Sequence, residues 1–134
     1  MFEKIHVGLT GERSIVVAEE HTAARWGSGG LDVFSTPYMI ALMEGAAVAA
    51  VDPLLPEGYQ SVGIRVEIDH LAPTPVGSKV VAHAELVEVD GRKLTFQVEA
   101  RDEAGIIGRG VHQRFIIHAE RFMAKARARR EAER

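Results

Sequence analysis

The feature that most constrains this chain is an apolar stretch over residues 36–51 that carries one charged residue, Glu44. A hydroxyl residue followed by proline, Thr36-Pro37, is typical of a helix start. Asp52-Pro53 is typical of a helix end, because the residue before a proline disfavours helical backbone. Since apolar residues lie on all sides, the pattern predicts a buried helix over about residues 37–51. The stretch is too short, and its charge too central, to span a bilayer.

The hydrophobic period changes to two after this helix. From Gln60 on, apolar and polar residues alternate, which is typical of strands with one apolar face. Asp90-Gly91 is a strong hairpin signal between two of these strands. The pattern predicts an antiparallel meander and then a solvated terminal helix. The expected strands cover residues 62–68, 80–86, 94–100 and 106–118, and the expected terminal helix covers residues 119–134.

The region before the apolar helix is less regular. Ile5–Val7 and Ser14–Val17 are expected to form two short strands around a turn at Thr10-Gly11. Trp26–Gly30 holds three glycines and is expected to be a flexible connection. No internal repeat or interdomain linker is visible, so residues 1–134 are expected to form a single domain.

These elements predict an α+β fold in which a curved antiparallel sheet wraps around the central helix. A sheet covers only part of a helix that is apolar on all sides. Loops or a second subunit must cover the rest, so we expect at least a dimer.

Composition excludes several classes of protein. The net charge of −3 argues against a general nucleic-acid binder. The chain has no cysteine, which removes disulfides, thiolate nucleophiles and cysteine-ligated zinc. No basic segment followed by a long apolar run opens the sequence, so no secretory signal is visible and a cytoplasmic, membrane-free protein is expected.

Glu44 and His70 are the first candidates for chemistry. His70 continues the apolar series of the strand over residues 62–68, so its side chain is expected on the face that packs against the helix of Glu44. A carboxylate and an imidazole in a core can form a general acid/base pair, or can merely satisfy each other. Thr36 is expected to cap the helix, and a helix N-terminus can also stabilise an anion or a developing oxyanion.

Two further residues are candidates. Gly63 lies inside a strand, where glycine marks a bulge or a close backbone approach. Arg114 shares a face with His112 and Ile116 and could pair with an acid or a phosphate, or form a surface ion pair. The histidines show no metal-ligand spacing, and no phosphate-binding or nucleophile-elbow motif occurs, so neither a metal nor a cofactor is expected.

The runs Phe34–Glu44 and Ser61–Gly77 resemble the hot-dog-fold acyl-CoA thioesterases of the fluoroacetyl-CoA thioesterase type. That family has a Thr at the start of the central helix, a Glu two turns later and a His at the end of the following strand. Thr36, Glu44 and His70 match these three residues in order and spacing, and the similarity covers nearly the whole chain. Gly63 and Arg114 match the family's substrate-binding glycine and last-strand arginine.

The resemblance implies a hot-dog fold that hydrolyses an acyl-CoA thioester, with CoA as part of the substrate. Glu44 attacks the carbonyl or activates water in this interpretation, while His70 and Thr36 orient and polarise the reacting groups. It also implies a homodimer or a dimer of dimers with sites at the subunit interface. The fluoroacetyl-specific enzyme gates its pocket with aromatic residues before the helix, whereas Trp26–Gly30 holds one aromatic residue here. The acyl group is therefore left open.

Two alternatives belong to other functional classes. One is a hydratase or dehydratase acting on acyl-CoA or acyl carrier protein, although the Thr-Glu-His order favours hydrolysis. The other is a non-catalytic acyl-CoA-binding module, which would present the same site without turnover.

Overall fold

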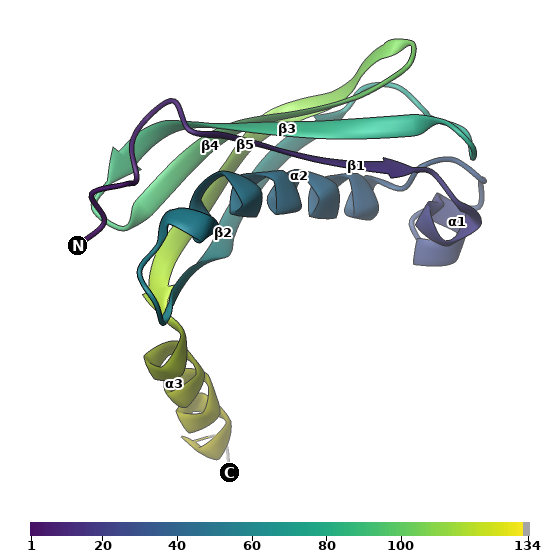
Figure 1. Ribbon diagram of the computed structural model, residues 1–134. Helices are drawn as coiled ribbons and strands as arrows, with labels where there is room; N and C mark the ends of the chain where they lie inside the picture. The colour runs from purple at the N-terminus through teal and green to yellow at the C-terminus, as the bar shows by residue number, and fades with distance from the viewer. Residues whose placement is uncertain (133–134) are drawn as a thin grey trace.

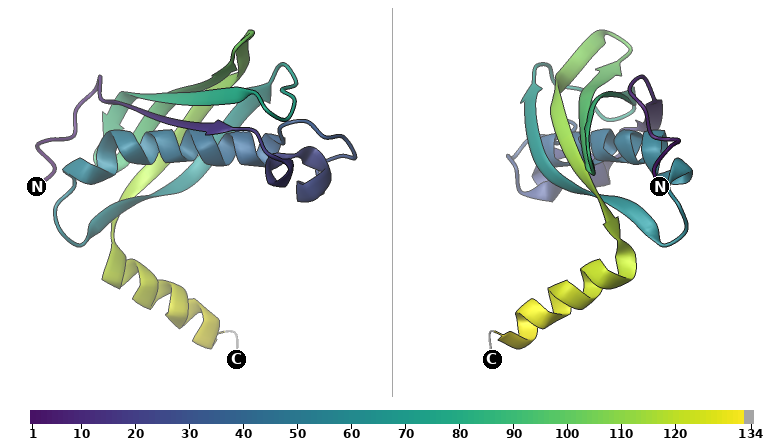
Figure 2. Two further views of the ribbon diagram at one scale, coloured as in Figure 1. Left: turned by 45° about the vertical axis from the view of Figure 1, so that its right-hand side comes forward. Right: turned by 90° about the vertical axis from the view of Figure 1, so that its left-hand side faces the viewer.

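The computed structural model describes residues 1–132 as a curled antiparallel sheet around one long helix (Figure 1). The sheet has five strands in the order β1-β3-β4-β5-β2. Helix α2 lies in the concave face of this sheet (Figure 2), so the expected α+β architecture is confirmed. The strands are β1 (Thr10–Val16), β2 (Tyr59–His70), β3 (Lys79–Asp90), β4 (Lys93–Asp102) and β5 (Gly105–His118). The helices are η1 (Glu19–His21), α1 (Ala23–Trp26), α2 (Thr36–Val51), η2 (Asp52–Leu54) and α3 (Ala119–Ala132).

Helix α2 begins at Thr36, but its N-cap is Ser35. The Ser35 hydroxyl accepts a hydrogen bond from the Tyr38 N–H at 3.2 Å, so the prediction that Thr36 caps the helix is wrong. A hydroxyl at either position fits the sequence pattern, and only Ser35 has the extended backbone that a capping residue needs. The Thr36 hydroxyl is therefore available for another partner.

The core forms where α2 meets the middle strands of the sheet. The alternating apolar residues of β3 and β4 are buried against the helix, as their period predicted; they include Val80, Ala82, Ala84, Leu86, Leu94, Phe96, Val98 and Ala100. Strand β1 passes so close to α2 that a side chain at Gly11 would collide with the backbone at Ala46 and Ala50. The small residues of α2 thus allow the sheet to close tightly around it.

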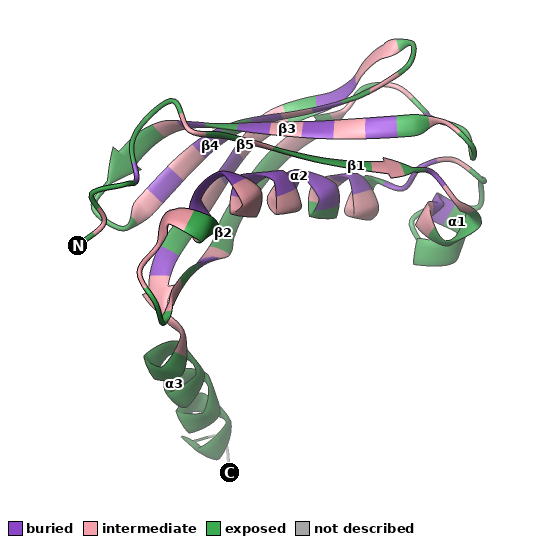
Figure 3. Ribbon diagram, viewed as in Figure 1, coloured by how far each residue is buried: buried purple, intermediate pink, exposed green. Residues whose placement is uncertain are grey.

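The opposite side of α2 is only partly covered within one chain (Figure 3). Ile40, Glu44 and Val48 are half-buried and Ala41 is exposed, at the three- and four-residue spacing of one helix face. The expectation that the whole helix is buried is therefore not met by a single chain.

Strand β2 departs from its predicted alternation. The register against β5 shifts between Gly63 and Arg65, which places a β-bulge at Ile64. A bulge inserts one extra residue and so exchanges the two faces of the strand. Before the bulge, Ser61 and Gly63 lie toward the helix; after it, Val66 and His70 share the face of their β5 partners His112 and Gly108. The predicted inward positions of Val62 and Ile64 are thus wrong.

The first segment also differs from the expectation. Ile5–Val7 is not a strand, and β1 runs through the predicted turn at Thr10-Gly11 because these residues pair with β3. Trp26 ends the short helix α1 rather than opening a loop. Helix α3 projects away from the sheet and is exposed, as expected, although residues 133–134 of that prediction lie outside the described residues (Figure 1). None of the described helices has the length and apolarity needed to cross a membrane.

Candidate active site

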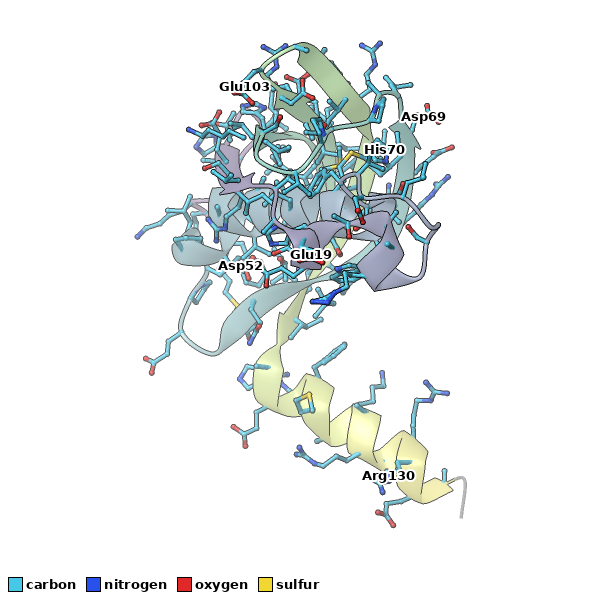
Figure 4. All side chains as sticks on the ribbon, turned by 90° about the vertical axis from the view of Figure 1, so that its right-hand side faces the viewer. Glu19, Asp52, Asp69, His70, Glu103 and Arg130 are labelled. Atoms are coloured by element: carbon cyan, nitrogen blue, oxygen red, sulfur yellow. The ribbon has the colours of Figure 1, made fainter. Side chains whose placement is uncertain are left out.

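Thr36 and His70 are brought together from two elements, α2 and β2, although they lie far apart in the sequence. The Thr36 Oγ1 lies 2.7 Å from the His70 Nδ1, a hydrogen-bonding distance across 34 residues of sequence. Thr36 is the first residue of α2 and His70 the last of β2, so both lie where an element meets a loop. Figure 4 shows His70 beside Asp69, which is on the exposed face of the same strand. The bond fixes the imidazole ring against the start of the helix.

The other ring nitrogen of His70 has no protein partner among the described residues. Its Nε2 is buried and makes no hydrogen bond. Burial lowers the pKa of His70, and the backbone of Ala72 acts more weakly in the opposite direction. The ring is therefore held neutral near pH 7, with one nitrogen bonded to Thr36 and the other available to a ligand.

A cavity of about 390 Å³ opens beside this pair. Thr36 and His70 both line it, together with segments before α2 and after β2. The other lining residues are small or mainly apolar: Ala23, Ser28, Gly29, Gly30, Leu31, Val33, Phe34, Leu71, Ala72 and Pro73. Among these described residues none is a carboxylate, a lysine or an arginine, so the cavity suits an uncharged group.

Glu44 lies farther along α2 and has different partners. Its Oε2 is 3.8 Å from the Arg114 Nη1 and 3.9 Å from the His112 Nε2. The carboxylate also lies over Gly63, where an added Cβ would be 2.8 Å from the same oxygen. Gly63 is thus a position of close approach, as the sequence predicted, and the approaching group is the Glu44 side chain.

Arg114 is buried rather than part of a surface ion pair. All three guanidinium nitrogens have partners: Nε donates to the Ser61 Oγ at 2.7 Å, Nη2 to the Ser61 carbonyl at 2.9 Å, and Nη1 to the His112 Nε2 at 3.1 Å. Burial lowers the pKa of Arg114, while the nearby Asp52 and Glu44 carboxylates raise it. Two carboxylates thus act on the guanidinium, one from within α2 and one from the residue that ends it.

The hydrogen bonds of His112 identify its tautomer. Its Nδ1 lies 2.8 Å from the Arg65 carbonyl, which can only accept, and its Nε2 faces Arg114, which can only donate. The ring is therefore neutral, with the proton on Nδ1. Burial is the main cause of the lowered pKa of His112, and the charge of Arg114 lowers this pKa further. The Arg65 carbonyl and the Glu44 carboxylate raise it by smaller amounts.

The predicted residues thus form two groups instead of one. Thr36 joins His70, while Glu44 joins Gly63 and Arg114, and among the described residues no contact links Glu44 to His70. The expected pairing within a chain is wrong because eight residues of helix separate Thr36 from Glu44 by about 12 Å. Both groups lie along the same partly covered side of α2.

Three residues of the second group were missed by sequence reasoning. The sequence marks His112 only as a neighbour of Arg114 on one face and Asp52 only as part of a helix end, and it gives Ser61 no role of its own. The available signal was that Ser61 lies two residues before Gly63 and so on the same face of the strand. The sequence alone assigned this face to solvent, because it did not show the bulge at Ile64. Their contacts cross strand β5, strand β2 and the end of α2, which no local pattern encodes.

Comparison with known proteins relates this geometry to a family. The model of the family described as "Fluoroacetyl-CoA-specific thioesterase" matches residues 17–120. The fluoroacetyl-CoA thioesterase of Streptantibioticus cattleyicolor is 44% identical over 101 residues, which cover 75% of this chain and 73% of that protein.

Solved structures agree with this match. A variant of the fluoroacetyl-CoA thioesterase FlK in complex with acetyl-CoA is 36% identical, with a TM-score of 0.87 over 93% of this chain and 98% of that one. A hot-dog-like protein from Thermanaerovibrio acidaminovorans is 26% identical, with a TM-score of 0.86 over 95% and 94% of the two chains. The fold is thus the hot-dog fold, and the chain belongs to the fluoroacetyl-CoA-specific thioesterase family.

Proposed function

We propose that this chain hydrolyses acyl-CoA thioesters to a free acid and CoA, using Thr36, His70 and Glu44. The observation that carries the reaction class is the family match, because residues 17–120 contain all three of these side chains. Their surroundings support the proposal: an imidazole with an unpartnered buried nitrogen, and a carboxylate beside a fixed cation.

Thr36 and His70 orient and polarise the thioester in this proposal. The His70 Nε2 faces the reacting group, while the Thr36 hydroxyl holds the ring through Nδ1. The start of α2 adds a backbone donor. Pro37 has no N–H, and the Tyr38 N–H donates to the Ser35 hydroxyl. The N–H of Thr36 is therefore the donor proposed for a developing oxyanion.

Glu44 supplies the reactive oxygen by one of two routes. As a nucleophile, its carboxylate bonds to the thioester carbon, the carbon–sulfur bond breaks, and water then hydrolyses the resulting anhydride. As a general base, it takes a proton from a water molecule whose oxygen attacks the same carbon. In both routes CoA leaves as the thiolate and takes up a proton. A single turnover in ¹⁸O-water identifies the nucleophilic route, because ¹⁸O enters the Glu44 carboxylate only when water attacks the Glu44 carbonyl carbon of the anhydride.

A second copy of the chain completes the site in this proposal. Strand β2 is an edge of the sheet and exposes Ile64, Val66 and, just beyond it, Leu71. The half-covered apolar face of α2 lies beside it. A two-fold axis that runs the two α2 helices in opposite directions would cover these residues and bring Glu44 of one protomer toward Thr36 and His70 of the other. A homodimer, alone or within a dimer of dimers, is the expected unit.

The cavity beside His70 is proposed to take an uncharged acyl group. Relatives act on fluoroacetyl-CoA, and one is seen with acetyl-CoA. The cavity of about 390 Å³ is large for a two-carbon group, since one water-sized group occupies roughly 30 Å³. An apolar acyl chain longer than acetyl therefore fits its lining.

Release of free CoA thiol from a panel of acyl-CoAs tests the function. The panel runs from acetyl and fluoroacetyl through straight-chain and aromatic acyl groups, and Glu44→Gln serves as the matched inactive variant. We expect thiol release that the Glu44→Gln variant loses. Tight binding of acyl-CoA without release in either protein would instead indicate a binding module.

A further inference from the structure

We propose that Asp52, Ser61 and His112 are positioning residues that hold the Arg114 guanidinium beside the Glu44 carboxylate. The inference rests on the proposed role of Glu44 in hydrolysis. It assigns a function to three residues that do not touch the expected position of the thioester.

Hydrogen bonds fix the plane of the Arg114 guanidinium. Arg114 is 7% exposed, and each of its three nitrogens meets an acceptor on Ser61 or His112. An arginine on the surface would lose this order, because its long side chain has many rotamers. Here the Nη1 is held by the His112 Nε2, and in this position it lies 3.8 Å from the Glu44 Oε2.

The hydrogen bonds of Ser61 run in one direction, from Arg114 through the Ser61 hydroxyl to Asp52. The Ser61 Oγ donates to the Asp52 Oδ1 at 2.6 Å, and the Ser61 N–H donates to the Asp52 Oδ2 at 3.1 Å. An ionised carboxylate only accepts, so the Ser61 proton points to Asp52 and its lone pair receives the Arg114 Nε–H. Asp52 thereby fixes the one hydroxyl orientation that binds the arginine. It also supplies a negative charge that helps to keep Arg114 charged while buried.

His112 holds the opposite side of the guanidinium. Its neutral ring accepts from Nη1 and is locked by the Arg65 carbonyl behind it. It is 1% exposed, so a protonated ring there would lose the bond to Arg114 and add a like charge beside it.

The 3.8 Å separation between Arg114 and Glu44 has a chemical consequence. It is too long for a hydrogen bond, yet close enough for charge attraction. The carboxylate thus receives the opposite charge that an acid on an apolar helix needs, while its oxygen stays free to attack carbon or accept a proton. A direct hydrogen bond would occupy that oxygen.

The other charged and titratable groups near Glu44 do not replace Arg114. Strand β5 contributes Arg114 and His112. Strand β1 contributes Arg13, whose side chain, including its Nε, lies beside Gly45 at the next helix position and forms no ion pair with Glu44 among the described residues. Arg114 is therefore the cation in direct contact, and its placement depends on Ser61 and Asp52.

The test uses Ser61→Ala and Asp52→Asn, with Ser61→Thr as the rescue that keeps the hydroxyl. We expect Ser61→Ala and Asp52→Asn to lower kcat roughly tenfold, the scale of one hydrogen bond to a charged group, with KM little changed. For Ser61→Ala, which removes no charge, the acid limb of kcat/KM should also move to higher pH, although Ser61 does not touch Glu44, and Ser61→Thr should restore both kcat and the limb.

The matched control is Thr74→Ala. Thr74 is a buried hydroxyl that donates to the Asp102 Oδ2 at 2.9 Å, so it repeats the Ser61–Asp52 contact elsewhere in the fold. Its loss should lower the melting temperature and leave the acid limb in place. The positioning role is overturned when Ser61→Ala and Asp52→Asn behave like Thr74→Ala.

A second measurement needs no turnover. Carbon-13 NMR of the Glu44 carboxyl, identified by its absence in Glu44→Gln, reports the surroundings of that group through its chemical shift at a fixed pH. We expect Ser61→Ala to change this chemical shift and Thr74→Ala to leave it in place, and an unchanged chemical shift in Ser61→Ala overturns the inference. If the wild-type protein hydrolyses no acyl-CoA, the proposed function fails, while this chemical shift still decides the positioning role.

Discussion

The hydrogen bond between the Thr36 Oγ1 and the His70 Nδ1, 2.7 Å long, joins the first residue of α2 to the last residue of β2. It exists because Ser35, and not Thr36, caps the helix. Two adjacent hydroxyl residues thus have separate tasks: one completes the helix end and the other holds an imidazole. This division can be tested with two neighbouring substitutions.

Thr36→Ala should reduce thioester hydrolysis and leave stability nearly unchanged, because Thr36 is exposed and caps nothing. Ser35→Ala should do the reverse, lowering the free energy of unfolding by about 1 kcal/mol through the lost cap. Thiol release and urea unfolding of both variants measure the two effects. Thr36→Ser keeps the hydroxyl and should keep most of the activity. Equal losses of activity in Ser35→Ala and Thr36→Ala would contradict the division of roles.

Gly63→Ala should lower activity more than stability. Its Cβ would lie 2.8 Å from the Glu44 Oε2, so the carboxylate must turn away from Arg114. The carboxylate is the flexible end of a half-exposed side chain, and the move therefore costs little folding free energy. Gly45→Ala is the matched control: its Cβ meets only the Arg13 side chain, and alanine within a helix is favoured by up to about 1 kcal/mol. A fully active Gly63→Ala would mean that the contact with Glu44 is not functional.

Glu44→Ala should abolish hydrolysis and destabilise the fold modestly. The substitution removes a carboxylate and leaves its charged neighbour Arg114 buried. Asp52 still compensates part of the Arg114 charge, so we expect a loss of about 1 kcal/mol in the free energy of unfolding. A melting curve and a thiol-release assay measure both effects. Wild-type activity in Glu44→Ala would show that the catalytic assignment is wrong.

The fold was predictable wherever one period continued along a segment. The strands now seen as β3 and β4 kept their faces, because the register shift of β3, between Leu86 and Glu88, lies beyond its buried residues. Strand β2 did not, because the extra residue at Ile64 changes its face, and Gly63 indicated a bulge or a close approach without deciding between them.

Residue type and spacing select Thr36, Glu44 and His70 as candidates, but they do not give the contacts of these residues. Helical geometry alone separates Glu44 from Thr36 by about 12 Å. The partners of Arg114 could not be predicted, since Ser61, His112 and Asp52 meet only after three elements pack. Long-range hydrogen bonds of this kind leave no periodic trace in a sequence.

A mixed dimer tests whether the site is shared between subunits. We expect Glu44→Ala and His70→Ala homodimers to be inactive. A dimer with one chain of each kind, isolated with two different tags, should regain about half of the wild-type activity, because one of its two sites is intact. A site within one chain would leave the mixed dimer inactive. Sedimentation of the wild-type protein at micromolar concentration provides the control for dimer formation, and a fully active monomer would contradict the shared site.

Acyl chain length should control the rate through the cavity beside His70. Each added methylene that becomes buried contributes about 0.8 kcal/mol, so kcat/KM should rise roughly fourfold per methylene over the first few carbons. Gly30→Val narrows the lining where an added Cβ meets open space, and should reduce hydrolysis of the longer chains selectively. Acetyl-CoA hydrolysis by the same variant is the internal control. A rate that falls steadily from acetyl onward would place the acyl group elsewhere.

Stability should decrease as the pH falls below the ordinary histidine range. Burial lowers the pKa of both His70 and His112 in the folded protein. Above about pH 6.5, the ordinary histidine value, both rings are neutral in the folded and unfolded states, and stability is complete. Below it the unfolded chain binds protons that the folded protein resists, so the free energy of unfolding falls, by at most about 1.4 kcal/mol per pH unit for each histidine.

Urea unfolding between pH 8 and pH 5 measures this slope. His112→Gln keeps a side-chain oxygen that can accept from Arg114 but does not titrate, so its slope should be smaller than that of the wild type. His6→Gln replaces an exposed histidine and controls for the substitution itself. Equal slopes for His112→Gln and the wild type would mean that His112 takes up its proton as easily in the fold as in the unfolded chain. The neutral ring that holds Arg114 would then be absent below pH 6.5, and the acid limb of hydrolysis would have to be assigned to His112 itself.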